Sequence, residues 1–207
     1  MRKILSSLLI AGCFLNCSFE ATANDLEPYN SIDILPFDAH GWFFNAEQLQ
    51  TCFNEKPIFT VIEVGSWLGC STRFIASSLK EGGKVYAVDT WLGSSEHVKS
   101  PRLPHLFQQF LSNVIHAKLT DKIVPIRMTS LEAAEALNVK ADLIYIDASH
   151  DTKSVVEDIL AWYPHLNEDG IMCGDDWKWA SVRAAVNQVA DQLGKSIYSS
   201  GNFWKLY

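Results

Sequence analysis

Two patterns of apolar and polar positions alternate along the chain from residue 59 onward. Short continuous apolar runs rich in β-branched residues are typical of strands buried in a parallel sheet. Between them, apolar residues recur every three or four positions, as in helices with one buried face. The runs predict strands at 59–64, 84–88, 123–128, 141–147, 171–174, 196–199 and 202–206. The periodic segments predict helices over 68–79, 107–115, 155–166 and 182–193, with shorter helices beginning near Asn45 and after Thr129.

Strands that alternate with helices in this way form a parallel sheet covered on both faces. A turn is expected at 167–170, before the fifth strand, and Gly201 separates the last two strands as in an antiparallel hairpin. The pattern therefore predicts an α/β domain at 59–207. Its expected architecture is a doubly wound, seven-stranded, mostly parallel sheet with a C-terminal antiparallel hairpin. Residues 24–58 form an N-terminal lead-in, punctuated by prolines and by Gly41.

The first 23 residues have the pattern of a secretory signal peptide. Two basic residues precede an apolar run over 4–19, and a small-x-small cleavage pattern follows at 21–23. The run is too short for a comfortable transmembrane helix, so we expect export to the periplasm or beyond and no stable membrane span. Residues 9–13 also resemble a lipobox, which would make Cys13 a lipidated N-terminus. A retained N-terminal helix on a cytoplasmic protein is the remaining alternative.

Composition limits the class of protein. The chain has 207 residues, of which 48% are hydrophobic and 20% charged, which suits one globular domain with a sizeable core. The formal net charge is −7 and there is no basic run, which argues against sequence-independent binding of nucleic acid. Cleavage after Ala23 leaves three cysteines, Cys52, Cys70 and Cys173, and an odd set is not a disulfide framework. Cys70 and Cys173 are expected to be buried, since both follow apolar patterns.

Acidic residues stand at the ends of four predicted strands. They are Glu63, Asp89, Asp147 and the pair Asp175-Asp176. The carboxyl ends of parallel strands meet at one edge of the sheet, where ligands of such folds bind. Buried charges need partners, so acids in these positions are not core fillers. Their placement predicts a ligand site at this edge.

A glycine-containing turn follows the first strand of the domain. It reads Glu63-x-Gly65-x-x-x-Gly69-x-Ser71. Glycines let the backbone approach a ligand, and the helix N-terminus that follows favours an anionic group such as an amino-acid carboxylate. Glu63 is suited to accept hydrogen bonds from an ammonium group. The spacing differs from the G-x-G-x-x-G fingerprint of dinucleotide sites, which disfavours a nicotinamide oxidoreductase.

Asp89 ends the second strand, 20 residues after Gly69. A carboxylate in that position is placed to accept hydrogen bonds from both hydroxyls of a ribose. Trp91, two residues further on, is expected to stack on an adenine ring.

The turn resembles motif I of class I S-adenosylmethionine methyltransferases, which have a Rossmann-like fold. Segments 61–71, 85–97 and 142–177 are similar to the group that includes catechol-type O-methyltransferases and small bacterial methyltransferase-domain families. The resemblance implies S-adenosylmethionine as cofactor and a small hydroxylated molecule as methyl acceptor; a homodimer is left open. It implies a cofactor site made of Glu63, Gly65, Ser66, Trp67, Gly69, Ser71, Asp89, Thr90, Trp91, Ser130 and Asp147. Ser130 would lie near the adenine, and residues 40–42 would fold over the cofactor.

The catechol-type group also implies a divalent cation, Mg²⁺ or Mn²⁺. Its ligands would be Asp147, Asp175 and Asp176, since carboxylates suit these hard cations. Two carboxylates about 4 Å apart repel by about 4 kcal/mol at an effective dielectric near 20, so a group of three favours a cation or protonation of one. The alternative is that Asp175 caps the following helix and Asp176 is solvated.

His150 lies three residues after Asp147, where catechol-type enzymes carry a catalytic lysine. A histidine takes up a proton near neutrality, so His150 and Asp147 are the candidate catalytic residues. Alternatively, His150 only orders its loop. The loop 92–105, with His97, is expected to be a lid on the acceptor side. A second hypothesis for the whole protein is a binding protein that keeps the cofactor pocket without turnover, because S-adenosylmethionine is made in the cytosol.

Overall fold

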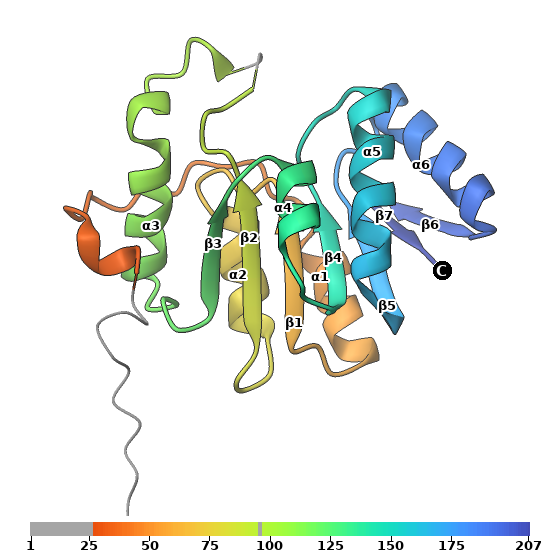
Figure 1. Ribbon diagram of the computed structural model, residues 1–207, viewed down its shortest axis with the longest axis horizontal. Helices are drawn as coiled ribbons and strands as arrows, with labels where there is room; N and C mark the ends of the chain where they lie inside the picture. The colour runs from red at the N-terminus through yellow and green to blue at the C-terminus, as the bar shows by residue number, and fades with distance from the viewer. Residues whose placement is uncertain (1–26, 95–96) are drawn as a thin grey trace, which may run out of the picture.

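The computed structural model describes residues 27–94 and 97–207, which form a central sheet between two layers of helices (Figure 1). The strand order is β3-β2-β1-β4-β5-β7-β6. The strands are β1 (Thr60–Val64), β2 (Lys84–Asp89), β3 (Ile123–Arg127), β4 (Ala141–Ile146), β5 (Leu166–Gly174), β6 (Ile197–Ser200) and β7 (Phe203–Leu206). The first five are parallel, whereas β7 pairs antiparallel with both β5 and β6. The predicted Rossmann-like sheet with its C-terminal hairpin is confirmed.

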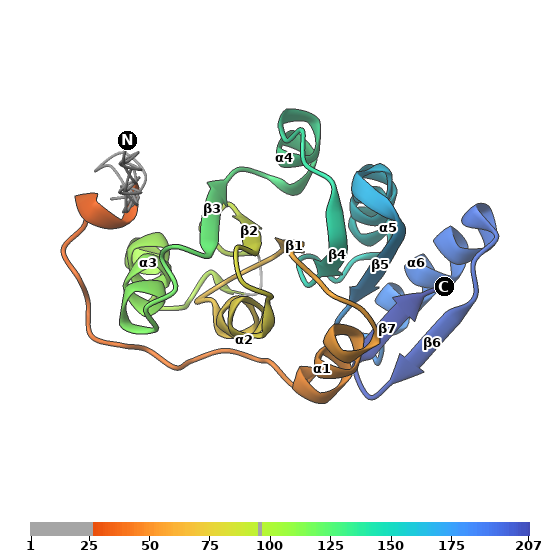
Figure 2. The ribbon, with the colours of Figure 1, turned by 90° about the horizontal axis from the view of Figure 1, so that it is seen from below.

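The α-helices cover both faces of this sheet (Figure 2). On one side lie α1 (Ala46–Glu55), α2 (Cys70–Ser78) and α3 (Leu106–His116). On the other lie α4 (Ser130–Ala136), α5 (Thr152–Trp162) and α6 (Ala180–Leu193). Each layer packs its apolar face on the sheet and forms a separate buried core. The alternating pattern predicted this arrangement because strands buried on both faces must be apolar throughout.

Local signals set the helix ends. Thr129 and Glu132 form a reciprocal capping box at the start of α4, as their spacing predicts. Gly194, in the left-handed conformation, ends α6. The turn predicted at 167–170 is different in the structure: Leu166 already pairs with Ala141, and the chain bulges before Ile171 pairs with Leu143. The strand therefore begins earlier than predicted and contains the turn as an irregularity.

The lead-in crosses the outside of α3 and α2 before it enters α1 (Figure 2). Asn113 of α3 fixes it, because its Oδ1 accepts from the backbone N–H of Asp38 (3.0 Å) and its Nδ2 donates to the Asp38 carbonyl (2.9 Å). The same Nδ2 donates to the Leu68 carbonyl in the turn after β1 (2.9 Å). Arg102 forms an ion pair with Asp38 (2.8 Å). The lead-in is thus tied to the helix layer and to the predicted cofactor turn.

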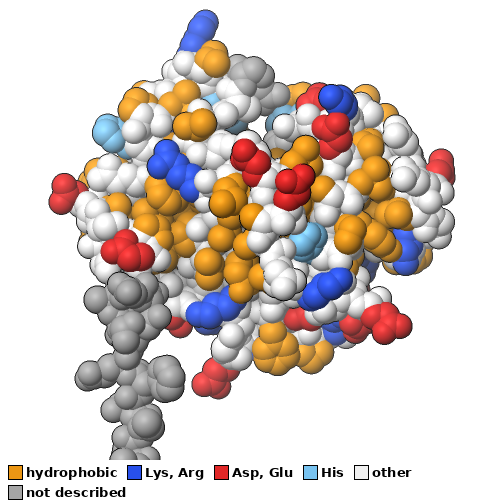
Figure 3. Space-filling view, viewed as in Figure 1, with side chains coloured by type: hydrophobic (Ala, Val, Ile, Leu, Met, Phe, Trp, Pro, Cys, Tyr) orange, Lys and Arg blue, Asp and Glu red, His pale blue; other side chains and the backbone are white. Residues whose placement is uncertain are grey.

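The predicted signal peptide, residues 1–23, lies outside the described residues. Within 27–94 and 97–207, no helix has the length and apolarity needed to cross a membrane. On the face shown in Figure 3, Lys and Arg side chains are scattered singly and interspersed with acidic and apolar ones. That face therefore presents no continuous basic surface.

Candidate active site

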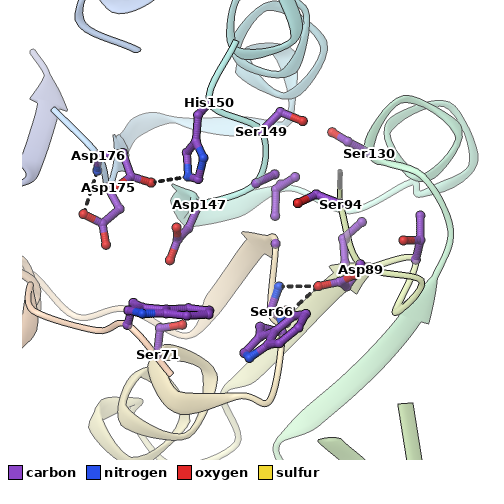
Figure 4. A pocket seen from close by; sticks show the side chains of 18 of the residues that line it. Ser66, Ser71, Asp89, Ser94, Ser130, Asp147, Ser149, His150, Asp175 and Asp176 are labelled. Atoms are coloured by element: carbon purple, nitrogen blue, oxygen red, sulfur yellow. Dashed lines mark hydrogen bonds and ion pairs between the residues drawn. The ribbon is translucent and has the colours of Figure 1, made fainter. Parts of the chain in front are cut away.

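A cavity of about 1190 Å³ opens at the carboxyl ends of the parallel strands. It is lined by residues after β1, β2, β3, β4 and β5, by the lead-in at 40–44, and by one side of α5. Four of the five strand-end acids line it, namely Asp89, Asp147, Asp175 and Asp176. Figure 4 shows Asp175, Asp176 and His150 at one end, Asp89 and Ser130 at the other, and Asp147 between them. The strand-end position predicted for the ligand site therefore coincides with a cavity.

The two glycines of the turn are required by packing within the chain. Gly65 has a φ of +92°, and a Cβ there would lie 2.0 Å from the carbonyl oxygen of Asp147. Gly69 has a φ of +77°, precedes α2, and a Cβ there would lie 2.9 Å from the ring of Phe110. Gly65 also lines the cavity, but Gly69 is not among the residues that line it. Gly69 was predicted to let the backbone approach a ligand. In the structure, the absence of a Cβ at Gly69 instead allows α2 to pack closely on α3.

Glu63 is fully buried beneath this turn. Its Oε2 accepts hydrogen bonds from the hydroxyls of Ser66 (2.7 Å) and Thr72, while its Oε1 has no partner among the described residues. Burial raises the pKa of Glu63. The side chain does not itself line the cavity, whereas its neighbours Ser66 and Ser71 do. Ser71 also forms a hydrogen bond that lowers the pKa of this carboxylate, so Glu63 supports the turn from beneath and the predicted contact with an ammonium group is not evident.

Asp89 holds the turn from the other side. Its Oδ2 accepts from the backbone N–H groups of Ser66 (3.0 Å) and Trp67 (2.8 Å), and its Oδ1 accepts from that of Trp91 (2.7 Å). A carboxylate has about four acceptor positions, so one remains on Oδ1. Asp89 therefore has room for one ribose hydroxyl rather than the two expected. Burial raises its pKa, and the three N–H donors oppose that rise.

Trp91 is buried in the core and is not among the residues that line the cavity. Its side chain is 1% exposed and packs against the rings of Phe107 and Phe110, both with centroids 4.7 Å away. Its indole Nε1 donates to the Trp67 carbonyl (2.8 Å). The residue has a positive φ of 50°, which turns the side chain into the helix layer. The prediction for Trp91 was wrong. Its position in the sequence, two residues after Asp89, suggested that the ring faces the cavity, but the ring is buried in the apolar core instead.

Aromatic rings cover the outside of the turn. The indole of Trp67 stacks on His97 (4.3 Å between centroids, 28° between planes) and donates from Nε1 to Nδ1 of His40 (3.4 Å). All three residues line the cavity. His97 also acts electrostatically on Asp89, so the described part of loop 92–105 lies beside the turn and Asp89. The lead-in at 40–42 does fold over the cofactor turn, with Gly41 against Cys70.

Cys70 lines the cavity at the start of α2 and is partly exposed, contrary to the expectation of burial. Cys173 is buried as expected, and so is Cys52. The difference follows from helix position, because Cys70 is the first residue of α2 and faces the turn rather than the sheet. All three thiols are free.

Two of the three aspartates predicted to bind a metal, Asp175 and Asp176, make other contacts. Asp175 Oδ1 accepts from the backbone N–H of Asp176 (2.6 Å), and Asp175 Oδ2 accepts from the Tyr145 hydroxyl (3.4 Å). Asp176 is paired with His150. Across residues 27–94 and 97–207, no group of three or more His, Cys, Asp and Glu side chains is arranged to hold a metal ion. The arrangement therefore does not support the predicted Mg²⁺ or Mn²⁺ site.

Asp147 projects into the middle of the cavity (Figure 4). Burial raises its pKa well above the usual range, and repulsion by Asp175 and Asp176 raises it further. Burial is also the main cause of the raised pKa of Asp175. A positive charge beside these groups would relieve both effects. The centre of the cavity therefore favours a cationic ligand.

His150 and Asp176 form a pair at one end of the cavity. His150 Nε2 lies 2.8 Å from Asp176 Oδ2, and the imidazole stacks on Trp179 (4.5 Å, 19°). Asp176 has a φ of +62°, a conformation that aspartate tolerates and that directs its carboxylate to the histidine. The Ser181 hydroxyl donates to the His150 carbonyl (2.5 Å). The pair is thus held in orientation from several sides, as a proton-accepting histidine requires.

Trp179 and Asp158 are among the lining residues that sequence reasoning missed. Trp179 precedes α6 and looked like any exposed aromatic. Asp158 lies beside Ile159 on the buried face of α5, and an acid on the apolar face of a helix was the available signal. Thr90 and Ser130 line the cavity as predicted.

Comparison with known proteins gives a consistent result. Residues 62–177 match the sequence pattern of a family described as a methyltransferase domain. An uncharacterised protein of Acanthamoeba polyphaga mimivirus is 27% identical over 173 residues, covering 79% of this chain and 73% of that protein.

Solved structures share the fold. The O-methyltransferase from Bacillus cereus, in complex with SAH, has a TM-score of 0.60 and 16% identity, covering 91% of this chain and 92% of that one. The O-methyltransferase TomG from Streptomyces achromogenes, involved in tomaymycin synthesis and in complex with SAM, has a TM-score of 0.63 and 13% identity, covering 90% and 88%. At these identities the similarity establishes a common architecture.

Proposed function

The chain belongs to the methyltransferase-domain family, and on that premise we propose that it transfers a methyl group from S-adenosylmethionine to a hydroxyl oxygen of a small molecule. S-adenosylmethionine supplies an electrophilic methyl group on a sulfonium; attack by the acceptor oxygen breaks the carbon–sulfur bond and leaves S-adenosylhomocysteine. The single observation that carries the assignment to oxygen is the His150–Asp176 pair, which shares one cavity with the turn after β1.

The residues of the chain fit such a cofactor. The N-terminus of α2, with Ser71 in the cavity wall, favours the carboxylate of the methionine part. The remaining acceptor position of Asp89 suits one ribose hydroxyl. The repulsion that raises the pKa of Asp147 is relieved by a sulfonium charge. The carboxylate, the ribose and the sulfonium of the ligand therefore each have a complementary group.

The proton of the acceptor hydroxyl goes to His150. Asp176 orients the ring through Nε2, and its carboxylate stabilises the imidazolium that forms when the ring takes up the proton. Trp179, stacked on the ring, gives this end of the cavity an apolar wall. Such a wall suits a planar acceptor and limits water near the oxygen.

Metal assistance, which the catechol-type resemblance implies, has no support in the contacts that Asp175 and Asp176 make. The proposed proton transfer therefore relies on His150 and Asp176 alone. Activity is expected to survive EDTA without loss, and added Mg²⁺ is expected to change it little. A strict requirement for Mg²⁺ would show that the aspartates rearrange to bind it and would overturn this part of the proposal.

The direct test is methyl transfer from labelled S-adenosylmethionine to a panel of phenols and alcohols. His150→Ala is expected to lower kcat by about 10²- to 10⁴-fold and to leave the Kd of S-adenosylmethionine nearly unchanged, because the histidine acts on the acceptor. His105→Ala, an exposed histidine outside the cavity wall, is the matched control. Equal loss in both variants, or cofactor binding with no product from any acceptor, would contradict the proposal and favour a binding protein.

A further inference from the structure

A buried carboxylate lies at the end of the cavity between α4 and α5, outside the predicted cofactor motif. Asp158, on α5, is 5% exposed and lines the cavity together with Ser130 and Ser154. In Figure 4, Ser130 lies across the cavity from Asp175 and Asp176. This carboxylate is therefore at the end opposite the proposed proton acceptor.

Hydrogen bonds hold the Asp158 side chain in place. The Ser130 hydroxyl accepts from the indole Nε1 of Trp162 (2.9 Å) and donates to Asp158. Because a hydroxyl has only one proton, Ser130 has none left to donate to a ligand. The charged groups that act on Asp158 are Glu157 and Asp151, which are also acidic. A buried carboxylate without a cation needs further donors, and it has acceptor positions for them.

The proposed cofactor carries a suitable donor. A cofactor with its methionine part at the start of α2 and its ribose at Asp89 would extend its adenine toward the end of the cavity that Ser130 and Asp158 line. We propose that Asp158 accepts a hydrogen bond from the 6-amino group of adenine and thereby selects adenine over 6-oxo purines. In the position of the 6-amino group, a 6-oxo oxygen would face the Asp158 carboxylate, so that two buried acceptors would lie against each other. A site built to bind an N–H at that position strongly rejects an analogue that lacks it.

This inference rests on the proposed function and deepens it by naming the group that recognises the base. Ser130, which was expected to bind the adenine directly, becomes a positioning residue that orients Asp158. Trp162 in turn orients Ser130. Recognition thus comes from α5 as well as from the segment after β3.

The test compares two ligands on the same full-length protein by calorimetric titration. One is S-adenosylhomocysteine, and the other is S-inosylhomocysteine, which differs by a 6-oxo group. The wild type is expected to prefer the adenine ligand by about tenfold to hundredfold. Asp158→Asn, whose amide presents a donor to a 6-oxo group, and Asp158→Leu, which presents no polar group, are each expected to reduce that ratio by about tenfold or more. Glu157→Gln, an exposed neighbour in the cavity wall, is the matched control and is expected to keep the ratio.

The ratio separates recognition from stability, because a merely structural defect weakens both ligands alike. An unchanged ratio in Asp158→Asn and Asp158→Leu would overturn the role of Asp158 while leaving the proposed function intact. Equal binding of both ligands by the wild type would do the same. Failure of the folded wild type to bind S-adenosylhomocysteine at all would overturn the proposed function together with this inference.

Discussion

At the scale of single residues, some side chains of this site both stabilise the local fold and are placed to bind a ligand. Asp89 uses three of its acceptor positions to fix the turn and leaves one for a ligand. Asp176 adopts a left-handed backbone to reach His150. Substitutions here therefore change stability and binding together, and each needs a control that separates the two.

Gly65 gives the sharpest stability prediction. Gly65→Ala adds a Cβ 2.0 Å from the Asp147 carbonyl oxygen at a φ of +92°. Left-handed strain and the backbone clash together should cost about 3–5 kcal/mol or prevent folding. Gly82→Ala is the matched control, since Gly82 has a φ of +77° with nothing within 4 Å, and should cost only about 1–2 kcal/mol. Urea unfolding measures both; equal losses would mean that the close approach of β1 and β4 is not as described.

Asp158 predicts a specific pH dependence of stability. Burial raises its pKa to about 6 in the folded protein, whereas the unfolded chain releases this proton near 4. Between these pH values the folded state binds more protons, so this residue makes stability fall as pH rises from about 4 to 6. Asp158→Asn removes that contribution. Its free energy of unfolding, relative to wild type, should rise by about 3 kcal/mol across the window and then stay constant. A difference that does not vary with pH in urea titrations would contradict the buried state of this carboxylate.

At the scale of elements, the lead-in and α3 support the cofactor turn through one side chain. Asn113 bonds to both backbone groups of Asp38 and to the Leu68 carbonyl. Periodicity predicted α3 as an amphipathic helix, but it did not predict that a polar residue on its buried side would hold a distant segment. Local patterns find elements, whereas contacts between segments 45 and 75 residues apart depend on how the elements pack.

Asn113→Ala is expected to cost about 2–4 kcal/mol, because it leaves several buried backbone groups without partners. It should also weaken binding of S-adenosylmethionine, since the turn after β1 loses a support. Gln108→Ala removes an exposed bond from the same helix to the Asp33 carbonyl in the lead-in and should cost less than about 1 kcal/mol. Thermal unfolding and calorimetric titration measure the two effects. Loss of stability without any change in affinity would show that the lead-in does not support the site.

At the scale of the whole molecule, the sequence predicted the sheet, its hairpin and the edge at which the site lies. These follow from apolar runs and from the rule that parallel strands end together. Trp91 could not be placed correctly, because only the packed core shows that its ring faces Phe107 and Phe110. The His150–Asp176 pair was also missed, since both residues had been assigned roles separately and their meeting depends on the backbone conformation after β5.

The central claim is that S-adenosylmethionine occupies the cavity beside Asp89, and calorimetric titration of the full-length protein tests it most directly. Wild type should bind in the micromolar range, a free energy of about −8 kcal/mol. Asp89→Ala should abolish detectable binding, while Asp191→Ala, an exposed acid on α6, should not change it. Circular dichroism of each variant confirms that it is folded. Absence of binding by folded wild type, or equal binding by folded Asp89→Ala, would contradict the account.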